Sequence, residues 1–268
     1  MKRLSIVGVG LLVLVLLAAA CGGGDDDKPP TATSPPKAQA TTPPQPTEAP
    51  GVGGYQEVAV TNGGSIAGVV TFSGTPPKVE LLTVDEDTDV CGTSQENPKL
   101  IVSAGGEIRN AVVSIKNITK GKAMAFPATV ALDQHGCKYT PHVLIGPVGG
   151  TLQVVNSDPI LHNVHSYTFD NPSVNRAQPK GSAAITSDLE FPEIIEIGCD
   201  IHGWMSAWLV VAEHPYYAIT GDDGAFQLTD VPPGSYEVEV WHEELGTLSQ
   251  AVTVEAGKTV EVVFELSQ

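Results

Sequence analysis

Beyond residue 54 the chain alternates short apolar runs with turn-forming residues, and this pattern predicts an all-β fold. The apolar runs are rich in Val, Ile and Thr, and Gly, Pro and Asp separate them. No long stretch shows the 3.6-residue apolar period of an amphipathic helix. The clearest strands are expected at residues 65–72, 111–115, 151–155 and 207–211. Two antiparallel sheets packed face to face are the expected architecture.

Three ligand-type side chains follow one another in the loop before the last of these strands. Cys199, His202 and Met205 recur at three-residue intervals, and His162 stands in an earlier polar segment. Two imidazoles, one thiolate and one weak thioether suit neither Cu(I) nor Cu(II) perfectly, so little rearranges on electron transfer. Structural zinc sites have no use for methionine. The pattern therefore predicts a copper site with these four residues as ligands.

The segments that carry these ligands, 156–164 and 198–211, resemble the copper-binding segments of cupredoxins of the plastocyanin and amicyanin type. The resemblance covers roughly residues 121–212. It implies a Greek-key β-sandwich that transfers single electrons through one type 1 (blue) copper. It also implies that Asn163 ties the two ligand loops together. Trp204 would belong to an apolar patch beside an exposed copper ligand, where electrons enter and leave.

The chain ends in a second β module. Residues 213–268 contain the turn elements Asp-x-Gly-x-Phe and Pro-Pro-Gly-x-Tyr, followed by a strand that alternates apolar and acidic residues. This segment resembles the carboxypeptidase regulatory-like domain, a small β-sandwich of the carbohydrate-binding-like superfamily. The match implies a fold rather than an activity.

Residues 64–74 and 110–115 resemble further strands of that module. The cupredoxin is therefore either inserted into a module built from both ends of the chain, or extended over the β segment 55–120 and followed by a contiguous C-terminal module.

The first 21 residues are typical of an export signal. Lys2 and Arg3 precede an apolar run that ends in Cys21 and resembles a bacterial lipobox, with Ala18 in place of the more usual Leu. The match implies that Cys21 is lipidated, and an ordinary secretory peptide is the alternative. Residues 22–54 lack apolar periodicity and are expected to form a disordered tether. We therefore expect the protein on the outer face of the cell membrane or in the periplasm.

The remaining cysteines and several polar residues each allow two interpretations. Cys91 and Cys137 are expected to form a disulfide in an oxidising compartment, and a second metal site that uses Cys137 and His142 is the alternative. His165 is expected to face away from the ligands, unless a bulge turns it toward the metal. The Asp222-Asp223 pair is expected in a hairpin turn, with calcium binding as the alternative.

The net charge of the chain limits the kinds of partner that we expect. The chain has 14 basic and 31 acidic residues, a formal net charge of −17. This balance argues against nucleic acid and favours a basic redox partner, such as a cytochrome or a membrane complex. No Ser-His-Asp or paired-carboxylate pattern indicates an enzyme. Electron transfer is the predicted function. A surface protein that sequesters copper or binds carbohydrate is the alternative, although aromatic residues are only 6% of the chain and mark no sugar platform.

Overall fold

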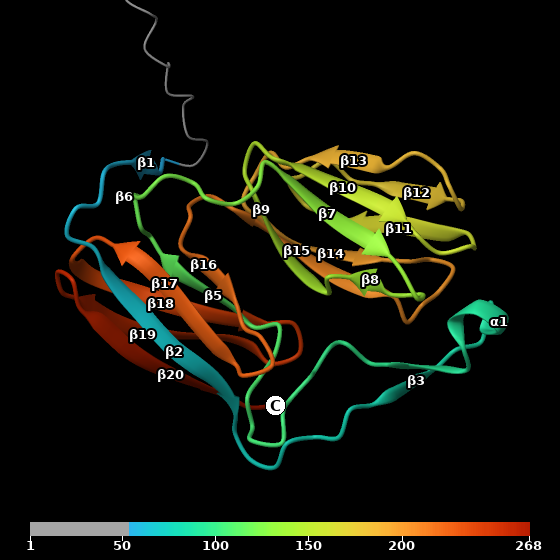
Figure 1. Cartoon of the computed structure of the whole chain (residues 1–268), viewed down its shortest axis with the longest axis horizontal. Helices are drawn as coiled ribbons and strands as arrows, with labels where there is room; N and C mark the ends of the chain where they lie inside the picture. Colours follow the sequence, from blue (N-terminus) through green and yellow to red (C-terminus); the bar gives the residue numbers. More distant parts are fainter. Residues whose placement is uncertain (1–53) are drawn as a thin grey trace, which may run out of the picture. The chain divides into compact units, whose positions relative to one another are not determined.

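The computed structural model describes residues 54–268, which form two β-sandwiches and one short helix (Figure 1). The predicted all-β class with two β-sandwiches is confirmed. The expectation of purely antiparallel sheets is wrong, because three strand pairs within these sheets are parallel. The predicted lipidation site Cys21 and nearly all of the predicted tether lie outside the described residues. Within residues 54–268 no helix is both long and apolar enough to cross a bilayer.

The first sandwich, which we call the split sandwich, combines strands from distant parts of the chain. Its sheets have the strand orders β16-β5-β18-β19 and β17-β2-β20. The strands are β2 (Gly64–Phe72), β5 (Val112–Lys116), β16 (Tyr217–Ile219), β17 (Ala225–Val231), β18 (Gly234–His242), β19 (Gly246–Val254) and β20 (Thr259–Leu266). In Figure 1 the cyan β2 lies beside the orange β17 and the red β20, to which it is hydrogen-bonded. Strands from before residue 117 and after residue 216 therefore share the same sheets.

The period-two pattern of the sequence explains the core of the split sandwich. In β20, Val262, Phe264 and Leu266 are buried, whereas Val263 between them is exposed. Strand β2 likewise buries Ile66, because alternate side chains of a strand point to opposite faces. The two sheets meet over these inward-facing residues.

The second sandwich, which we call the inserted sandwich, lies between β5 and β16 in the chain. Its sheets have the orders β13-β10-β7-β8 and β12-β11-β14-β15-β9. The strands are β7 (Thr129–Gln134), β8 (Tyr139–Thr140), β9 (Val143–Pro147), β10 (Thr151–Asn156), β11 (His162–Tyr167), β12 (Asn175–Gln178), β13 (Ile185–Asp188), β14 (Glu193–Gly198) and β15 (Ser206–Ala212). Leu132, Val154, Ile197 and Leu209 are fully buried between the sheets.

A connection between β2 and β5 leaves the split sandwich and reaches the inserted one. It contains β3 (Leu81–Thr83), helix α1 (Thr88–Cys91) and β4 (Ser94–Glu96), and β3 pairs with β4. Outside this connection, β1 (Gln56–Glu57) pairs with β6 (Lys120–Gly121). The predicted disulfide between Cys91 and Cys137 is confirmed. It joins α1 to the turn between β7 and β8. The rival metal site at Cys137 and His142 is therefore wrong, because the sulfur of Cys137 is taken by Cys91.

The two sandwiches pack through aromatic and polar contacts. The rings of Trp208 and Trp241 lie 5.1 Å apart between centroids. Glu243 of the split sandwich accepts a hydrogen bond of 2.8 Å from Trp208 Nε1 and also bonds His142 Nε2. His142 is thus a structural link between the two sandwiches.

Candidate metal centre

The ligand-bearing segments lie at one end of the inserted sandwich. His162 is the first residue of β11, and the loop from Cys199 to Met205 connects β14 to β15. The two strands are antiparallel, with Gly198 opposite Ser206, so the loop closes a hairpin. Backbone hydrogen bonds from Cys199 to Met205 (3.3 Å) and from Met205 to His202 (2.9 Å) hold the loop in a tight turn.

Two imidazoles and one thiol meet at this end. His162 Nδ1 lies 2.9 Å from His202 Nδ1, and Cys199 Sγ lies 3.7 Å from the same His202 nitrogen. One ligand atom of each residue lies within 4.8 Å of the others. Both histidines are fully buried, and Cys199 is the free cysteine of the described residues. The three side chains could together hold a metal ion.

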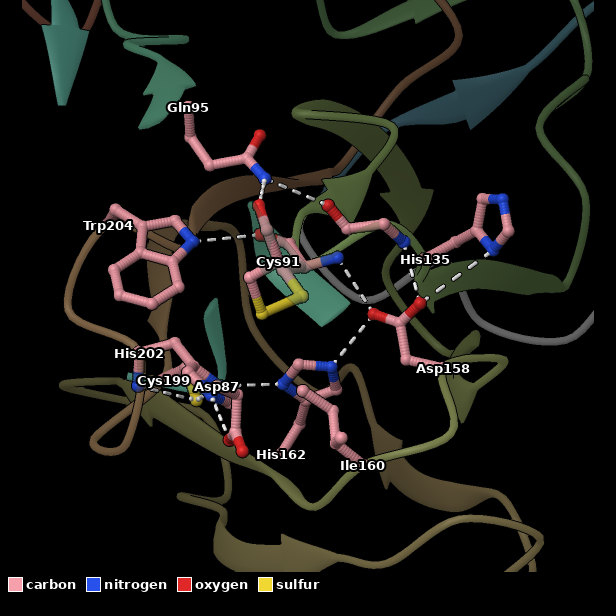
Figure 2. Close-up of a disulfide and its surroundings, with 12 residues drawn as sticks. Asp87, Cys91, Gln95, His135, Asp158, Ile160, His162, Cys199, His202 and Trp204 are labelled. Atoms are coloured by element: carbon pink, nitrogen blue, oxygen red, sulfur yellow. Dashed lines mark hydrogen bonds and ion pairs between the residues drawn. A yellow bond between two sulfur atoms is a disulfide. The ribbon is translucent and has the colours of Figure 1, made fainter. Parts of the chain in front are cut away.

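The far nitrogen of each imidazole bonds a carboxylate. His162 Nε2 lies 2.9 Å from Asp158 Oδ2, and His202 Nε2 lies 2.9 Å from Asp87 Oδ2 (Figure 2). A carboxylate accepts a hydrogen bond, so each imidazole carries its proton on Nε2 and turns the lone pair of Nδ1 inward. Two lone pairs at 2.9 Å repel each other unless a cation or a proton lies with them. This donor set therefore fits a bound metal, with carboxylates orienting the histidines from outside.

The electrostatics of Asp158 and His162 support that protonation state. Burial lowers the pKa of His162, the neighbouring His202 lowers it further, and the bond to Asp158 opposes both. Burial alone would raise the pKa of Asp158, but the Cys137 N–H, His162 and the Gly136 N–H together hold it below its usual value. A neutral imidazole beside an ionised carboxylate is the form in which histidine binds a metal.

The cysteine sulfur also has defined partners. The backbone N–H groups of Asn163 and His202 both point to Cys199 Sγ at 3.4 Å. The Asn163 side chain accepts a hydrogen bond of 3.1 Å from the Asp200 N–H. Asn163 therefore joins β11 to the loop that carries the cysteine, which is the position that the cupredoxin resemblance implies for it. Hydrogen bonds to a ligating sulfur tune the redox potential of a copper site.

Met205 lies beside this cluster and is buried with Cys199 in the core of the inserted sandwich. Its side chain and Cys199 also line one surface hollow. The role of Met205 as the weak fourth ligand stays a prediction from the sequence spacing.

The expectation of an exposed ligand at His202 is wrong. His202 is fully buried, because Asp87 from the connection before α1 covers its outer nitrogen. Trp204 is also nearly buried, and its ring centroid lies 5.1 Å from that of His202. Its indole N–H donates to the Cys137 carbonyl oxygen at 3.1 Å. Trp204 therefore packs the loop against the disulfide rather than forming an exposed patch.

Neither carboxylate was predicted from the sequence. Asp158 had a weak signal in the sequence, because it lies four residues before His162 in the same polar segment. Asp87 had none, because it lies far from the ligands in the chain and no local pattern connects them.

The other polar residues with two interpretations have structural roles. His165 faces away from the cluster, and its Nδ1 lies 2.9 Å from Asp200 Oδ1. In the C-terminal turn, Asp223 Oδ1 accepts a hydrogen bond from the Ala225 N–H, and Asp222 pairs with Arg109. These contacts match the expected hairpin turn.

A family model matches the C-terminal part of the chain. Residues 207–267 match the model of the carboxypeptidase regulatory-like domain. The match starts within β15 and runs through β16 to β20, so it contains the C-terminal strands of the split sandwich. No curated protein matches the chain.

Similarity to solved structures is partial. A Cu-containing nitrite reductase (NirK) from Thermus scotoductus SA-01 is 24% identical over 34% of this chain and 24% of its own, with a TM-score of 0.30. A purple cupredoxin from Nitrosopumilus maritimus is 20% identical over 31% of this chain and 99% of its own, with a TM-score of 0.27. An oxidised mutant of amicyanin is 23% identical over 37% and 98%, with a TM-score of 0.28. The chain thus spans about a quarter of the nitrite reductase and nearly all of the two smaller proteins.

Proposed function

We propose that the protein is a type 1 copper protein that transfers single electrons between redox partners. The observation that carries this proposal is the buried cluster of His162 Nδ1, His202 Nδ1 and Cys199 Sγ, with both outer nitrogens bonded to carboxylates. Copper held there would supply one-electron chemistry between Cu(I) and Cu(II).

The residues of the chain have separate roles in this proposal. His162 and His202 present neutral imidazoles, Cys199 presents a thiolate, and Met205 presents a weak thioether. The backbone N–H groups at Cys199 Sγ and the tight loop hold these donors in one arrangement. A fixed arrangement keeps the reorganisation on electron transfer small. Four protein ligands leave no open position for a substrate, so we propose electron transfer rather than an enzyme.

We further propose that the sandwiches are attached to a membrane. A lipid on Cys21 and the tether over residues 22–54 would hold them on the outer face of the cell membrane or in the periplasm. The acidic net charge of −17 supports a basic redox partner, because opposite charges steer association. Carbohydrate remains an alternative ligand for the regulatory-like domain alone.

Visible absorption and EPR spectra of the Cu(II)-loaded protein test the copper proposal. We expect an intense thiolate-to-copper band with narrow hyperfine splitting, and a loss of about tenfold or more of that band in Cys199→Ser. His162→Gln should also lose it. His165→Gln is the matched control, because His165 faces away from the cluster. A colourless Cu(II) complex, or a band that survives Cys199→Ser, would favour a copper-sequestering or other binding protein.

A further inference from the structure

The connection between β2 and β5 covers the outer edge of the candidate metal centre. We call residues 84–97 the cover segment. Its Asp87 Oδ2 lies 2.9 Å from His202 Nε2, and the Asp87 side chain is 45% exposed while His202 is 0% exposed. Asp87 therefore stands between this imidazole and solvent.

The local conformation of Asp87 directs its carboxylate toward His202. Asp87 precedes helix α1 with φ 47° and ψ 39°, in the left-handed region that L-residues rarely adopt. Aspartate at this position usually accepts a hydrogen bond from the first turn of its helix. Here it makes no such capping bond. The Asp87 carboxylate is therefore not engaged by helix α1, and its hydrogen bond goes to His202.

The cover segment is anchored in the core of the inserted sandwich at Val84 and Cys91, which are both buried. Residues 85–90 are all exposed. The disulfide from Cys91 to Cys137 is its covalent anchor. Gln95 adds two hydrogen bonds from Nε2, of 2.8 Å to the Cys91 carbonyl and 3.3 Å to the Gly136 carbonyl. Asp87 therefore lies in an exposed stretch that is held by Val84 on one side and by the disulfide on the other.

Cys137 connects the supports of both histidines. Its N–H donates to Asp158 Oδ2 at 2.8 Å, and the same carboxylate oxygen bonds His162. Its carbonyl accepts from Trp204 in the loop that carries His202. Its sulfur is bonded to Cys91, next to the turn that carries Asp87. Figure 2 shows these contacts around the disulfide.

We propose that Asp87 is a positioning residue for His202, and that the Cys91–Cys137 disulfide holds it there to close the metal centre against solvent. This inference rests on the proposed copper site. Asp87 keeps the His202 proton on Nε2 and the Nδ1 lone pair directed inward. Without Asp87, the imidazole takes up both tautomers and water reaches its outer edge. Copper would then leave the site faster.

The test compares Asp87→Ala with Asp89→Ala, which removes an exposed carboxylate from the same turn. Nitrogen-15 NMR of the metal-free protein reports which His202 nitrogen carries the proton. We expect the proton on Nε2 in the wild type and in Asp89→Ala, and a mixture of tautomers in Asp87→Ala. In the copper-loaded protein, a chelator should remove copper about 10–100 times faster from Asp87→Ala, as for other outer-sphere partners. Asp89→Ala should stay within about twofold of the wild type.

The double variant Cys91→Ser, Cys137→Ser tests the anchor. It should speed copper loss in the same direction, and adding Asp87→Ala should increase the rate by much less than the product of the two separate effects. If the double variant does not fold, the Asp87 variants, which keep the disulfide, decide the question.

The outcomes separate the two proposals. Equal tautomers and equal copper loss in Asp87→Ala and Asp89→Ala would overturn the positioning role. A wild type without the intense copper band would overturn the proposed function, whereas the tautomer shift in the metal-free protein would still support the role of Asp87.

Discussion

The two sandwiches are built from similar alternating strands, but they bury polar side chains in different ways. In the split sandwich, His214 and His242 each accept a hydrogen bond from the backbone N–H two residues further on. Thr220 bonds only backbone groups of Ile108 and Ala111. These polar residues bond separate backbone groups rather than one another, and His242 Nε2 has no hydrogen-bond partner within the described residues.

In the inserted sandwich the buried polar groups converge instead. His162, His202 and Cys199 come from two segments and turn their donor atoms toward one another. Their hydrogen bonds to Asp87 and Asp158 lie on the outside of the cluster. The comparison teaches that burial of a histidine does not by itself indicate a site. Two imidazole lone pairs that face each other, as those of His162 and His202 do, indicate a metal site.

The largest expected effect is a loss of stability in the split sandwich that leaves the metal centre unchanged. Phe264→Ala removes a fully buried ring from the split sandwich and should lower the free energy of unfolding by about 3–5 kcal/mol. Phe169→Ala in the inserted sandwich is the control, because Phe169 is 96% exposed, and it should change that free energy by less than about 0.5 kcal/mol. Urea unfolding of the metal-free protein measures both. The copper spectrum of folded Phe264→Ala should match the wild type, and an altered spectrum would show that the core of the split sandwich influences the metal centre.

The next effect is a pH dependence of the split sandwich. Burial lowers the pKa of His214 from 6.5 to about 4. Between pH 6.5 and pH 4, His214 is protonated in the unfolded chain but neutral in the folded protein. The contribution of neutral His214 to stability is therefore present above pH 6.5 and is lost as the pH falls toward 4. The loss at pH 4 is on the order of 3 kcal/mol.

His214→Asn keeps an acceptor for the Tyr216 N–H but removes the titration. Urea unfolding of metal-free wild type and variant at pH 7 and pH 4 should show the larger acid loss in the wild type. Equal losses would mean that His214 titrates normally in the folded protein.

A smaller effect compares two asparagines of the inserted sandwich that are equally buried, at 7% exposure. Asn163 bonds the ligand loop, whereas Asn171 bonds backbone groups of Glu190 and Phe191. Replacement of either by Ala should lower the free energy of unfolding by about 1–3 kcal/mol, because each leaves buried polar groups without a partner. Only Asn163→Ala should also shift the thiolate-to-copper band, as seen in absorption spectra. A shifted band in Asn171→Ala would show that the loop responds to any loss of stability.

The smallest effect concerns the exposed ion pair of Arg109 and Asp222, whose charged atoms lie 3.1 Å apart. Exposed pairs contribute little, so Asp222→Ala should change the free energy of unfolding by less than about 1 kcal/mol. Calcium at millimolar concentration should leave the Tm of both proteins unchanged. A rise of the wild-type Tm that Asp222→Ala abolishes would restore the calcium interpretation of this turn.

Much of the fold could be predicted because it is encoded locally. The strand expected at residues 151–155 is β10 (Thr151–Asn156), and the strand expected at 207–211 is β15 (Ser206–Ala212). Period-two alternation and turn residues act over a few positions, so they are readable in one sequence. The disulfide could be predicted for a different reason, since Cys91 and Cys137 were the pair left over.

The candidate site could be predicted only in part. Cys199 and His202 lie in one loop, and the chemistry of their side chains restricts what they bind. The carboxylate that bonds His202 could not be predicted, because Asp87 lies 115 residues from His202 in the chain. The prediction of an exposed ligand beside Trp204 was wrong for the same reason, because the residue that covers His202 lies far from it in the chain.

By itself, the sequence determined the β-strands, their inward faces and the types of ligand available, because these depend on neighbouring residues and side-chain chemistry. Only the tertiary structure decided that β2 and β20 share a sheet, that the histidines face each other, and that Asp87 closes their outer edge. Those contacts join segments far apart in the chain. Packing of the whole molecule selects them, and no local pattern records that choice.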